Sequence, residues 1–273
     1  MRFLENRFAA TLICVLMTTG LAEAGSVGAA APEPMTVRLT TAPAGADGSV
    51  RGALLLDLAP GWKTYWVDPG TSGIPPTIDF AATSGLGHAE LHFPAPHRFG
   101  EGLARANGYN RSLAVAFELA PAAGAELGPV AASVMMGVCR EICVPVQATL
   151  TTAEADAGAV QAAFAALPER GEAPAELASA RLAGDMLTVA ITRPEQGGTS
   201  APRDDADLFV AGPAGWYFDE PDAPARQGDR LVFQVPVLER PRGEAGPPER
   251  VDVVFTDGAG ALEAKGLAVA PSR

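Results

Sequence analysis

Hydrophobic and polar residues alternate in short runs along the first half of the chain, and turn-forming residues separate these runs. Alternation with a period of two is typical of strands that bury one face, while Gly, Pro, Asn and Asp between runs indicate turns. Such turn signals occur at Ala46-Asp47-Gly48 and at Asn107-Gly108. The pattern predicts strands over residues 35–42, 50–60, 113–120, 130–138 and 144–152.

The pattern changes to helical spacing between residues 153 and 171. Val160, Phe164 and Leu167 recur at intervals of three or four residues, and Pro168 follows them. A helix interior does not accommodate proline, so this residue marks the end of a helix. Strand-like alternation then resumes in the segments "ARLAGDMLTVAIT", "ADLFVAG", "DRLVFQVPVL", "RVDVVFTD" and "KGLAVAP".

These elements predict an all-β chain made of two β-sandwich units that a short helix joins. The first unit is expected over residues 33–152, the helical linker over 153–171 and the second unit over 176–270. The composition agrees, because 30 glycines and 24 prolines suit many short strands connected by turns.

The first 24 residues have the pattern of a secretory signal peptide. Arg2 and Arg7 precede the apolar run "FAATLICVLMTTGLA", and small residues for a cleavage site follow at Ala22-Glu23-Ala24. The run is shorter than the roughly 20 apolar residues that a membrane span needs. Gly, Pro or charge interrupts every later apolar run. We therefore expect cleavage near Ala24, export, and a mature protein that does not span a membrane.

Charge and motifs exclude several function classes. The net charge of −12 at pH 7 disfavours nucleic acids and anionic membrane surfaces, since both attract clusters of Lys and Arg. The sequence contains no nucleophile elbow, phosphate-binding glycine loop or H-E-x-x-H motif. Ordinary hydrolase chemistry therefore has no signature in this chain.

The segment "GVCREICVPV" carries the most specific chemistry. Of the three cysteines, Cys14 lies in the predicted leader, which leaves Cys139 and Cys143. In an extended chain residues four apart are about 13 Å from each other, whereas the Cα atoms of a disulfide are usually about 4.4–6.8 Å apart. A turn must therefore lie between the cysteines, and the predicted strands on either side place "CREIC" at an exposed tip.

Spacing and compartment leave two interpretations of this pair open. Disulfides form and persist in oxidising compartments, which agrees with export. A structural disulfide that closes a five-residue loop contributes about 2 kcal/mol in the chain-entropy model. Exposure at a strand end equally suits a redox-active pair that meets a partner. Between these two, the residues alone do not decide.

A metal site is a further alternative, because soft sulfur and imidazole ligands suit Cu(I) or zinc. Its candidate ligands, beside the two cysteines, are His88, His92, His97, Met135 and Met136. On a strand, His88 and His92 share a face but lie about 13 Å apart, which disfavours a common ion. A cluster of Trp62, Tyr65 and Trp66 followed by Asp68 is expected either to pack in the core or to cover the thiol pair.

Four segments in this order and at these separations resemble a known family. They are "GWKTYWVDPGTSGIPPTIDF", "FPAPHRF", "NGYNRSLAVAFEL" and "VCREICVPV". Residues 35–152 are similar to the N-terminal periplasmic domain of the thiol:disulfide interchange protein DsbD, and closer to its ScsB-like branch. That branch is linked by name to suppression of copper sensitivity.

The resemblance implies an immunoglobulin-like β fold that bears a redox-active pair at Cys139 and Cys143 and needs no cofactor. In the family this pair passes electrons from a membrane-embedded reductase to exported thiol–disulfide proteins, as a protein-disulfide reductase component. The resemblance also implies a cover over the thiols, for which the loop from Asp68 to Pro76 is the candidate. The expected thiol environment comprises Trp62, Tyr65, Trp66, Asp68, Arg140 and Glu141.

Two departures from DsbD itself stand out. The cysteines are closer together here, and the printed chain carries neither a transmembrane segment after the β units nor a thioredoxin-like domain. We thus expect a stand-alone periplasmic dithiol/disulfide carrier. The alternatives are a periplasmic copper-binding or copper-tolerance protein and a non-catalytic interaction module with a structural disulfide.

Overall fold

The computed structural model describes residues 33–152, 154–170, 178–192, 206–244, 246–258 and 260–271. The predicted signal peptide lies outside these residues. The described chain from Glu33 onward forms one structural unit. Among the described residues, no helix is long and apolar enough to cross a membrane.

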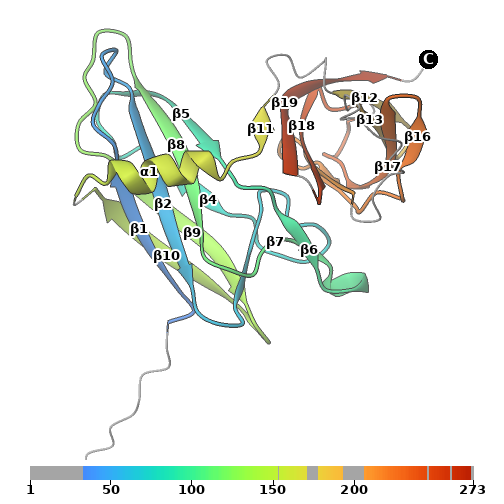
Figure 1. Cartoon of the computed structure of the whole chain (residues 1–273), viewed down its shortest axis with the longest axis horizontal. Helices are drawn as coiled ribbons and strands as arrows, with labels where there is room; N and C mark the ends of the chain where they lie inside the picture. The colour runs from blue at the N-terminus through green and yellow to red at the C-terminus, as the bar shows by residue number, and fades with distance from the viewer. Residues whose placement is uncertain are drawn as a thin grey trace, which may run out of the picture. The chain divides into compact units, whose positions relative to one another are not determined.

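The first β-sandwich consists of two facing sheets (Figure 1). One sheet has the order β1-β2-β8-β5, with bounds β1 Met35–Thr41, β2 Val50–Leu58, β8 Leu113–Pro121 and β5 Leu86–His92. The other has the order β10-β9-β3-β7-β6, with bounds β10 Cys143–Thr151, β9 Ala131–Cys139, β3 Lys63–Tyr65, β7 Ala106–Tyr109 and β6 His97–Phe99. The short strand β4 (Thr77–Asp79) also pairs with β9, and a 3-10 turn, η1 (Gly102–Ala104), connects β6 to β7.

Alternating side chains from the two sheets form the core of this sandwich, as the period-two pattern predicts. Phe117 is fully buried, and its ring centroid lies 4.7 Å from that of Phe80. Gly52 lies directly opposite Phe117 in the β2–β8 ladder. A Cβ atom at Gly52 would approach the Phe117 ring to 2.1 Å, so the glycine provides the space that this ring fills. Leu54, Val115 and Leu119 complete the centre of the core.

The predicted helix is present as α1 (Ala157–Ala165). The Asp156 side chain caps its first turn by accepting a hydrogen bond from the Ala159 N–H, at 2.9 Å. Its buried residues Val160 and Ala163 pack on the outer face of the first sheet, where α1 lies across β1, β2 and β8 (Figure 1). The helix therefore covers the first sandwich.

The second sandwich is built from strands later in the chain, with the order β14-β18-β19-β12-β13-β17-β15. The bounds are β11 Glu169–Arg170, β12 Ala178–Ala183, β13 Met186–Thr192, β14 Asp207–Ala211, β15 Tyr217–Phe218, β16 Ala225–Gln227, β17 Arg230–Glu239, β18 Arg250–Asp257 and β19 Gly260–Pro271. β11 pairs with β19, and β16 pairs with β17. The all-β, immunoglobulin-like fold class predicted above is thus confirmed.

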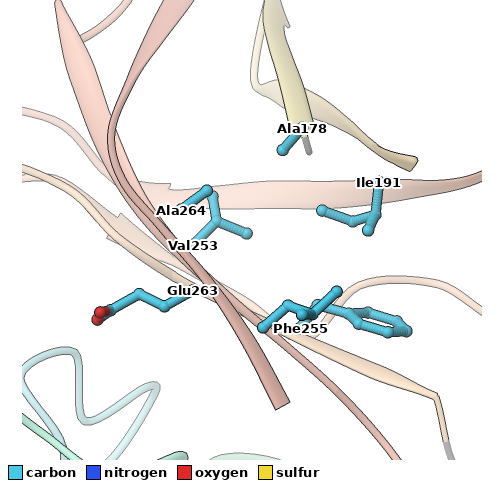
Figure 2. Close-up of a pocket in the computed structure, with 7 residues that line it drawn as sticks. Ala178, Ile191, Val253, Phe255, Glu263 and Ala264 are labelled. Atoms are coloured by element: carbon cyan, nitrogen blue, oxygen red, sulfur yellow. The ribbon is translucent and has the colours of Figure 1, made fainter. Parts of the chain in front are cut away.

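The core of the second sandwich is apolar, with Leu187, Val189, Phe233 and Val235 fully buried. It contains a cavity of about 10 Å³, which is room for one water molecule at most. Ala178, Ile191, Val253, Phe255, Leu262, Glu263 and Ala264 line this cavity. Figure 2 shows the Glu263 carboxylate directed away from the apolar side chains, so the space offers no polar site for a ligand.

Candidate functional site

The β9–β10 hairpin holds the two cysteines at its tip, as the flanking strand patterns predicted. Cys139 ends β9, Cys143 begins β10, and the two residues lie directly opposite each other in the ladder. Their side chains form a disulfide, and their Cα atoms are 4.1 Å apart. The Arg140 N–H donates to the Ile142 carbonyl at 3.2 Å across the turn. The required turn therefore consists of Arg140, Glu141 and Ile142.

The two cysteines differ in exposure, so the prediction of an exposed tip is right for only one of them. Cys143 is exposed, and Ile142 beside it is 70% exposed. Cys139 is 8% exposed, because Tyr65, Ala106 and the partly buried Phe99 pack around it. These covering residues come from β3 and from the β6–η1–β7 hairpin. A partner would therefore meet the Cys143 side of the disulfide first.

Tyr65 contacts the disulfide directly. Its hydroxyl donates a hydrogen bond to Cys139 Sγ at 2.7 Å and lies 3.5 Å from Cys143 Sγ. The Tyr65 ring is buried, with its centroid 6.1 Å from that of Phe99. Burial raises the pKa of the Tyr65 hydroxyl above its usual value of 10.0, so the group remains protonated and able to donate. The site thus combines a disulfide with a fixed hydrogen-bond donor on its buried sulfur.

The loop from Asp68 to Pro76 lies against the Tyr65 ring. A Cβ atom at Gly73 would come within 2.7 Å of two atoms of that ring, so only glycine permits this close approach. Ile74 in the same loop contacts β9, where it occupies the space above Gly137. The loop therefore contacts Tyr65, and Tyr65 in turn contacts the disulfide.

The Asp68 carboxylate bonds to its own loop and to the second sandwich. It accepts hydrogen bonds from the Gly70 N–H at 2.9 Å and from the Phe218 N–H at 3.3 Å. Asp68 is 3% exposed, and this burial raises the pKa of its carboxyl from 3.8 to about 6, against the lowering effect of the two hydrogen bonds and of Arg98. The Asn107 amide fixes the same residue by donating to its backbone carbonyl at 3.2 Å.

The remaining residues of the expected thiol environment take separate positions. The Arg140 guanidinium lies 5.4 Å from the centroid of the Trp62 ring, on the flank of the tip. Glu141 is exposed within the turn. Trp66 is buried on the side of β3 opposite to Tyr65, where its ring contacts Phe209 of the second sandwich edge-on at 6.1 Å. Arg140 and Trp62 therefore border the site, while Trp66 belongs to the core.

Sequence reasoning missed Phe99 and Ala106 as neighbours of the disulfide. Lys63 accompanies them, because its ammonium lies 4.6 Å from the centroid of the Phe99 ring. The segments "HRF" and "ANGY", with glycines between them, do indicate a hairpin. No local signal shows that this hairpin packs on Cys139, since the contact depends on pairing between distant strands.

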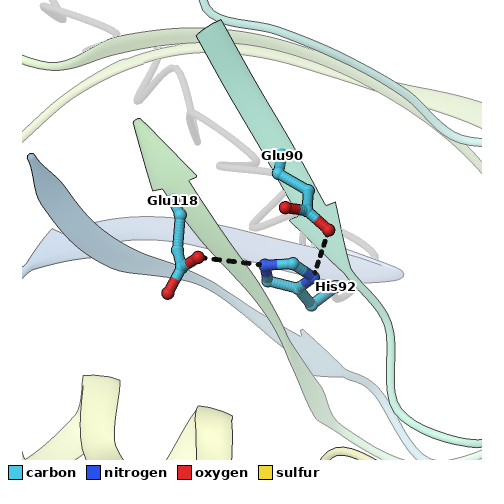
Figure 3. A group of neighbouring side chains, drawn as sticks. All are labelled: Glu90, His92 and Glu118. Atoms are coloured by element: carbon cyan, nitrogen blue, oxygen red, sulfur yellow. Dashed lines mark ion pairs between the residues drawn. The ribbon is translucent and has the colours of Figure 1, made fainter. Parts of the chain in front are cut away.

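The three histidines considered as metal ligands lie apart. His88 is exposed on β5, and His97 lies on β6. His92 is buried, and in the described residues it forms the one group with metal-ligand spacing, together with Glu90 and Glu118 (Figure 3). His92 Nδ1 is 3.5 Å from Glu90 Oε1, and His92 Nε2 is 3.8 Å from Glu118 Oε2.

Two cations already occupy the space at His92 Nδ1. Lys265 Nζ lies 3.1 Å from this nitrogen and 3.1 Å from Glu90 Oε1, and Arg170 Nη2 lies 2.5 Å from the nitrogen. Burial, followed by these two positive charges, lowers the pKa of His92 from 6.5 to about 4. The group is thus an ion-pair network between the sandwiches, and its charges oppose a bound cation.

The two methionines project to opposite faces of β9. Met136 is 1% exposed and belongs to the first core, whereas Met135 faces an open groove with Gln147 and Thr149. Met135 lies four residues before Cys139 on one strand, which corresponds to about 13 Å. The described geometry therefore does not bring a thioether and the cysteine pair together at one ion.

Comparisons with known proteins agree with this architecture. A family model described as "Thiol:disulfide interchange protein DsbD, N-terminal" matches residues 31–155. The crystal structure of the N-terminal periplasmic domain of ScsB from Proteus mirabilis is similar, with a TM-score of 0.66 and 22% identity over 88% of this chain and 95% of that one.

Two further solved structures carry no weight in the assignment. The tandem Ig repeats of Dlar align with a TM-score of 0.19 and 10% identity over 88% of this chain and 98% of that one. The N-terminal Ig1-2 module of Drosophila receptor protein tyrosine phosphatase DLAR gives 0.18 and 12% over 88% of this chain and all of that one. No curated protein sequence matches the chain.

The resemblance found in four sequence segments is confirmed by the family match and by the likeness in fold. The disulfide between Cys139 and Cys143 lies within the matched residues. Residues 31–155 therefore match the family of the N-terminal domain of the thiol:disulfide interchange protein DsbD, and together with the disulfide they support a thiol–disulfide interchange domain in this part of the chain.

Proposed function

We propose that this protein is a periplasmic dithiol/disulfide carrier that passes reducing equivalents between a membrane reductase and exported proteins. The observation that carries the proposal is the asymmetry of the disulfide. Cys143 is exposed beside the turn, while Cys139 is buried and its sulfur accepts the Tyr65 hydrogen bond. A structural disulfide needs no such donor, whereas an exchanging one benefits from it.

The first step of exchange is attack by a partner thiolate on Cys143 Sγ. A bond forms between the partner sulfur and Cys143, the Cys139–Cys143 bond breaks, and Cys139 leaves as a thiolate. The Tyr65 hydroxyl stabilises that thiolate, because a hydrogen bond to a charged acceptor is stronger than one to a neutral acceptor. Lower basicity of the leaving thiol makes this step faster.

The second step releases the partner. A second thiolate of the reducing partner attacks the partner sulfur of the mixed disulfide, and Cys143 leaves as a thiolate. The partner becomes oxidised to a disulfide, and this chain gains two electrons as a dithiol. The reverse sequence transfers the two electrons to the disulfide of an exported protein.

The border of the site supports docking of a protein partner. Ile142 offers an exposed apolar side chain next to Cys143, and Arg140 lies on the Trp62 ring at the flank. Residues 1–24 have the pattern of an export signal, and the similar ScsB domain is described as periplasmic. Disulfide exchange of this kind suits an oxidising compartment.

Oxidised glutathione provides a direct test of the roles of the two cysteines. The Cys139→Ser variant keeps the exposed thiol, so we expect it to form a glutathione adduct about tenfold faster than the Cys143→Ser variant. Intact-protein mass spectrometry follows the adduct, and the double serine variant is the control. Equal rates would contradict attack at Cys143.

The redox potential tests the carrier role itself. Equilibration of the wild-type protein with glutathione buffers should give a redox potential above about −300 mV. Structural disulfides typically have potentials below that value. A lower potential together with no measurable exchange would show that the disulfide is only structural.

A further inference from the structure

The hairpin that covers Cys139 is hydrogen-bonded to the second sandwich. Building on the carrier function above, we propose that Arg98 and Arg105 are positioning residues through which this sandwich holds the β6–η1–β7 hairpin closed. Through the hairpin they set how readily the disulfide exchanges. The second sandwich is then a regulator of access to Cys139, the buried cysteine of the pair.

The covering hairpin has little structure of its own. β6 and β7 share three residue pairs, and β7 and β3 share two, Thr64 with Tyr109 and Tyr65 with Gly108. A two-stranded hairpin of this size is at best marginally stable alone. Phe99 and Ala106 are a pair within it, and both contact the cluster that contains Tyr65 and Cys139. Its position therefore depends on contacts made elsewhere.

Arg98, in β6, supplies the first of these contacts. Its Nε donates to Asp207 Oδ2 at 2.9 Å, and its Nη2 donates to the Leu208 carbonyl at 2.6 Å. Its guanidinium lies 4.6 Å from the centroid of the Phe209 ring. On the other side, Nη1 donates to Asn107 Oδ1 in β7 at 3.0 Å. One nearly buried guanidinium thus joins both strands of the hairpin to the start of β14.

Arg105 supplies the second contact, directly before Ala106. Its Nη2 donates to Asp219 Oδ1 at 2.9 Å, and its Nη1 donates to Glu220 Oε2 at 2.5 Å. Both acceptors follow β15 in the second sandwich. The backbone carbonyl of Arg105 also accepts a hydrogen bond from the Ser72 N–H at 3.1 Å. The same residue therefore ties the hairpin to the loop that lies on Tyr65.

Asp68 extends this attachment to the loop. Its carboxylate accepts from the Phe218 N–H, one residue before Asp219. The loop and the hairpin, which both contact Tyr65, are therefore held by adjacent residues at the end of β15. A movement of this part of the second sandwich would move both covers of the buried sulfur together.

A separate ion-pair network between the sandwiches offers a matched control. Lys265, in β19, contacts Glu90, His92 and the Leu91 carbonyl of β5. These contacts involve neither the covering hairpin nor the loop. Loss of Lys265 weakens the attachment of the two sandwiches without touching the covers of Cys139.

The test measures reduction of the disulfide by excess glutathione in the full-length protein, in which two glutathione thiols give one glutathione disulfide and the protein dithiol. We expect Arg105→Ala to react about three- to tenfold faster than wild type, because an opened hairpin exposes Cys139 Sγ as a second point of attack beside Cys143. A change of this size corresponds to the loss of partly buried ion pairs. Arg105→Lys, which retains the charge, should restore part of the wild-type rate. Lys265→Ala should react at the wild-type rate.

A second variant and a second readout guard against a folding defect. Removing the acceptors with Asp219→Asn and Glu220→Gln should accelerate reduction as Arg105→Ala does. Hydrogen exchange of the amides in residues 97–109 should become faster in the same variants and stay unchanged in Lys265→Ala. Unchanged amide exchange and unchanged reduction rates in all Arg105, Asp219 and Glu220 variants would overturn the inference.

The two proposals fail in different ways. A wild-type disulfide that glutathione does not reduce contradicts the carrier function, while faster amide exchange in residues 97–109 would still support the role of Arg105. A disulfide that exchanges normally, with rates insensitive to Arg105, leaves the carrier function standing and rejects the positioning role.

Discussion

The two sandwiches bury very different kinds of residue. Eight polar or charged residues are buried in the described chain, and Glu263 alone belongs to the second sandwich. The other seven are in the first, and they include Thr64, Asp68 and Asn107 around the disulfide site. Buried polar groups cost free energy unless they are paired, so a fold retains them where they serve geometry or chemistry. Buried polar residues are therefore concentrated in the sandwich that carries the disulfide, whereas the core of the second sandwich is almost entirely apolar.

The largest expected effect tests whether the two cores are independent. Phe117→Ala and Phe233→Ala each remove a fully buried ring, one from each core, and each should lower the free energy of unfolding by about 3–5 kcal/mol. We expect Phe117→Ala to destabilise the sandwich that carries the disulfide and Phe233→Ala the other. Hydrogen exchange of core amides, resolved by segment, separates the two.

A single cooperative transition would break this comparison. If either substitution accelerates amide exchange equally in both cores, the sandwiches unfold as one unit, and the ion pairs between them are stronger than their partial exposure indicates.

The next effect is a pH dependence of the free energy of unfolding, which arises from the buried Asp68 carboxyl in the first sandwich. The pKa of Asp68 is raised from 3.8 to about 6, so the folded protein binds this proton more tightly than the unfolded chain. The resulting stability is fully present below about pH 4 and is lost as the pH rises through 6. The shift corresponds to about 3 kcal/mol. Denaturant unfolding from pH 4 to pH 7 should show this loss in wild type relative to Asp68→Asn.

His92 contributes with the opposite sign in the same range. Its pKa is lowered from 6.5 to about 4, so its contribution is present above pH 6.5 and is lost as the pH falls through 4. Comparison of wild type with Asp68→Asn isolates the Asp68 part, because both proteins contain His92. A pH-independent difference between the two proteins would contradict the buried, proton-binding Asp68.

The smallest predicted effect isolates one hydroxyl in the first sandwich. Tyr65→Phe keeps the ring that packs on Phe99 and removes the donor to Cys139 Sγ. Hydrogen bonds to charged groups contribute about 1.5–3 kcal/mol, so reduction by glutathione should slow about 10- to 100-fold. Unfolding of the second sandwich should not change. An unaltered reduction rate would assign Tyr65 to packing alone.

The position of the disulfide was predictable from local pattern. Strands expected at 130–138 and 144–152 are observed as β9 and β10, shifted by one residue at each end, so that the cysteines are strand residues. The need for a turn followed from chain geometry, and the ladder register then places the cysteines opposite each other. Both arguments use only residues near each other in the sequence.

The environment of the disulfide was not predictable in the same way. Tyr65 lies 74 residues before Cys139, and Asp68 lies 150 residues before its partner Phe218. Such contacts depend on the pairing of β3 with β9 and on the docking of a second sandwich, which no local periodicity encodes. The aromatic cluster was recognised as a candidate, yet only the fold separates Tyr65, which touches sulfur, from Trp66, which packs in the core.

The β9–β10 ladder has a consequence for how long any partner stays attached. Nine residue pairs hold the strands together, so their pairing keeps the Cα atoms of Cys139 and Cys143 close whether or not the sulfurs are bonded. The two thiols therefore have a high effective concentration toward each other. In a covalent complex on Cys143, the neighbouring thiolate of Cys139 can expel the partner without waiting for a second molecule. We therefore expect such complexes to be short-lived, as a consequence of the three-residue turn that separates the two cysteines.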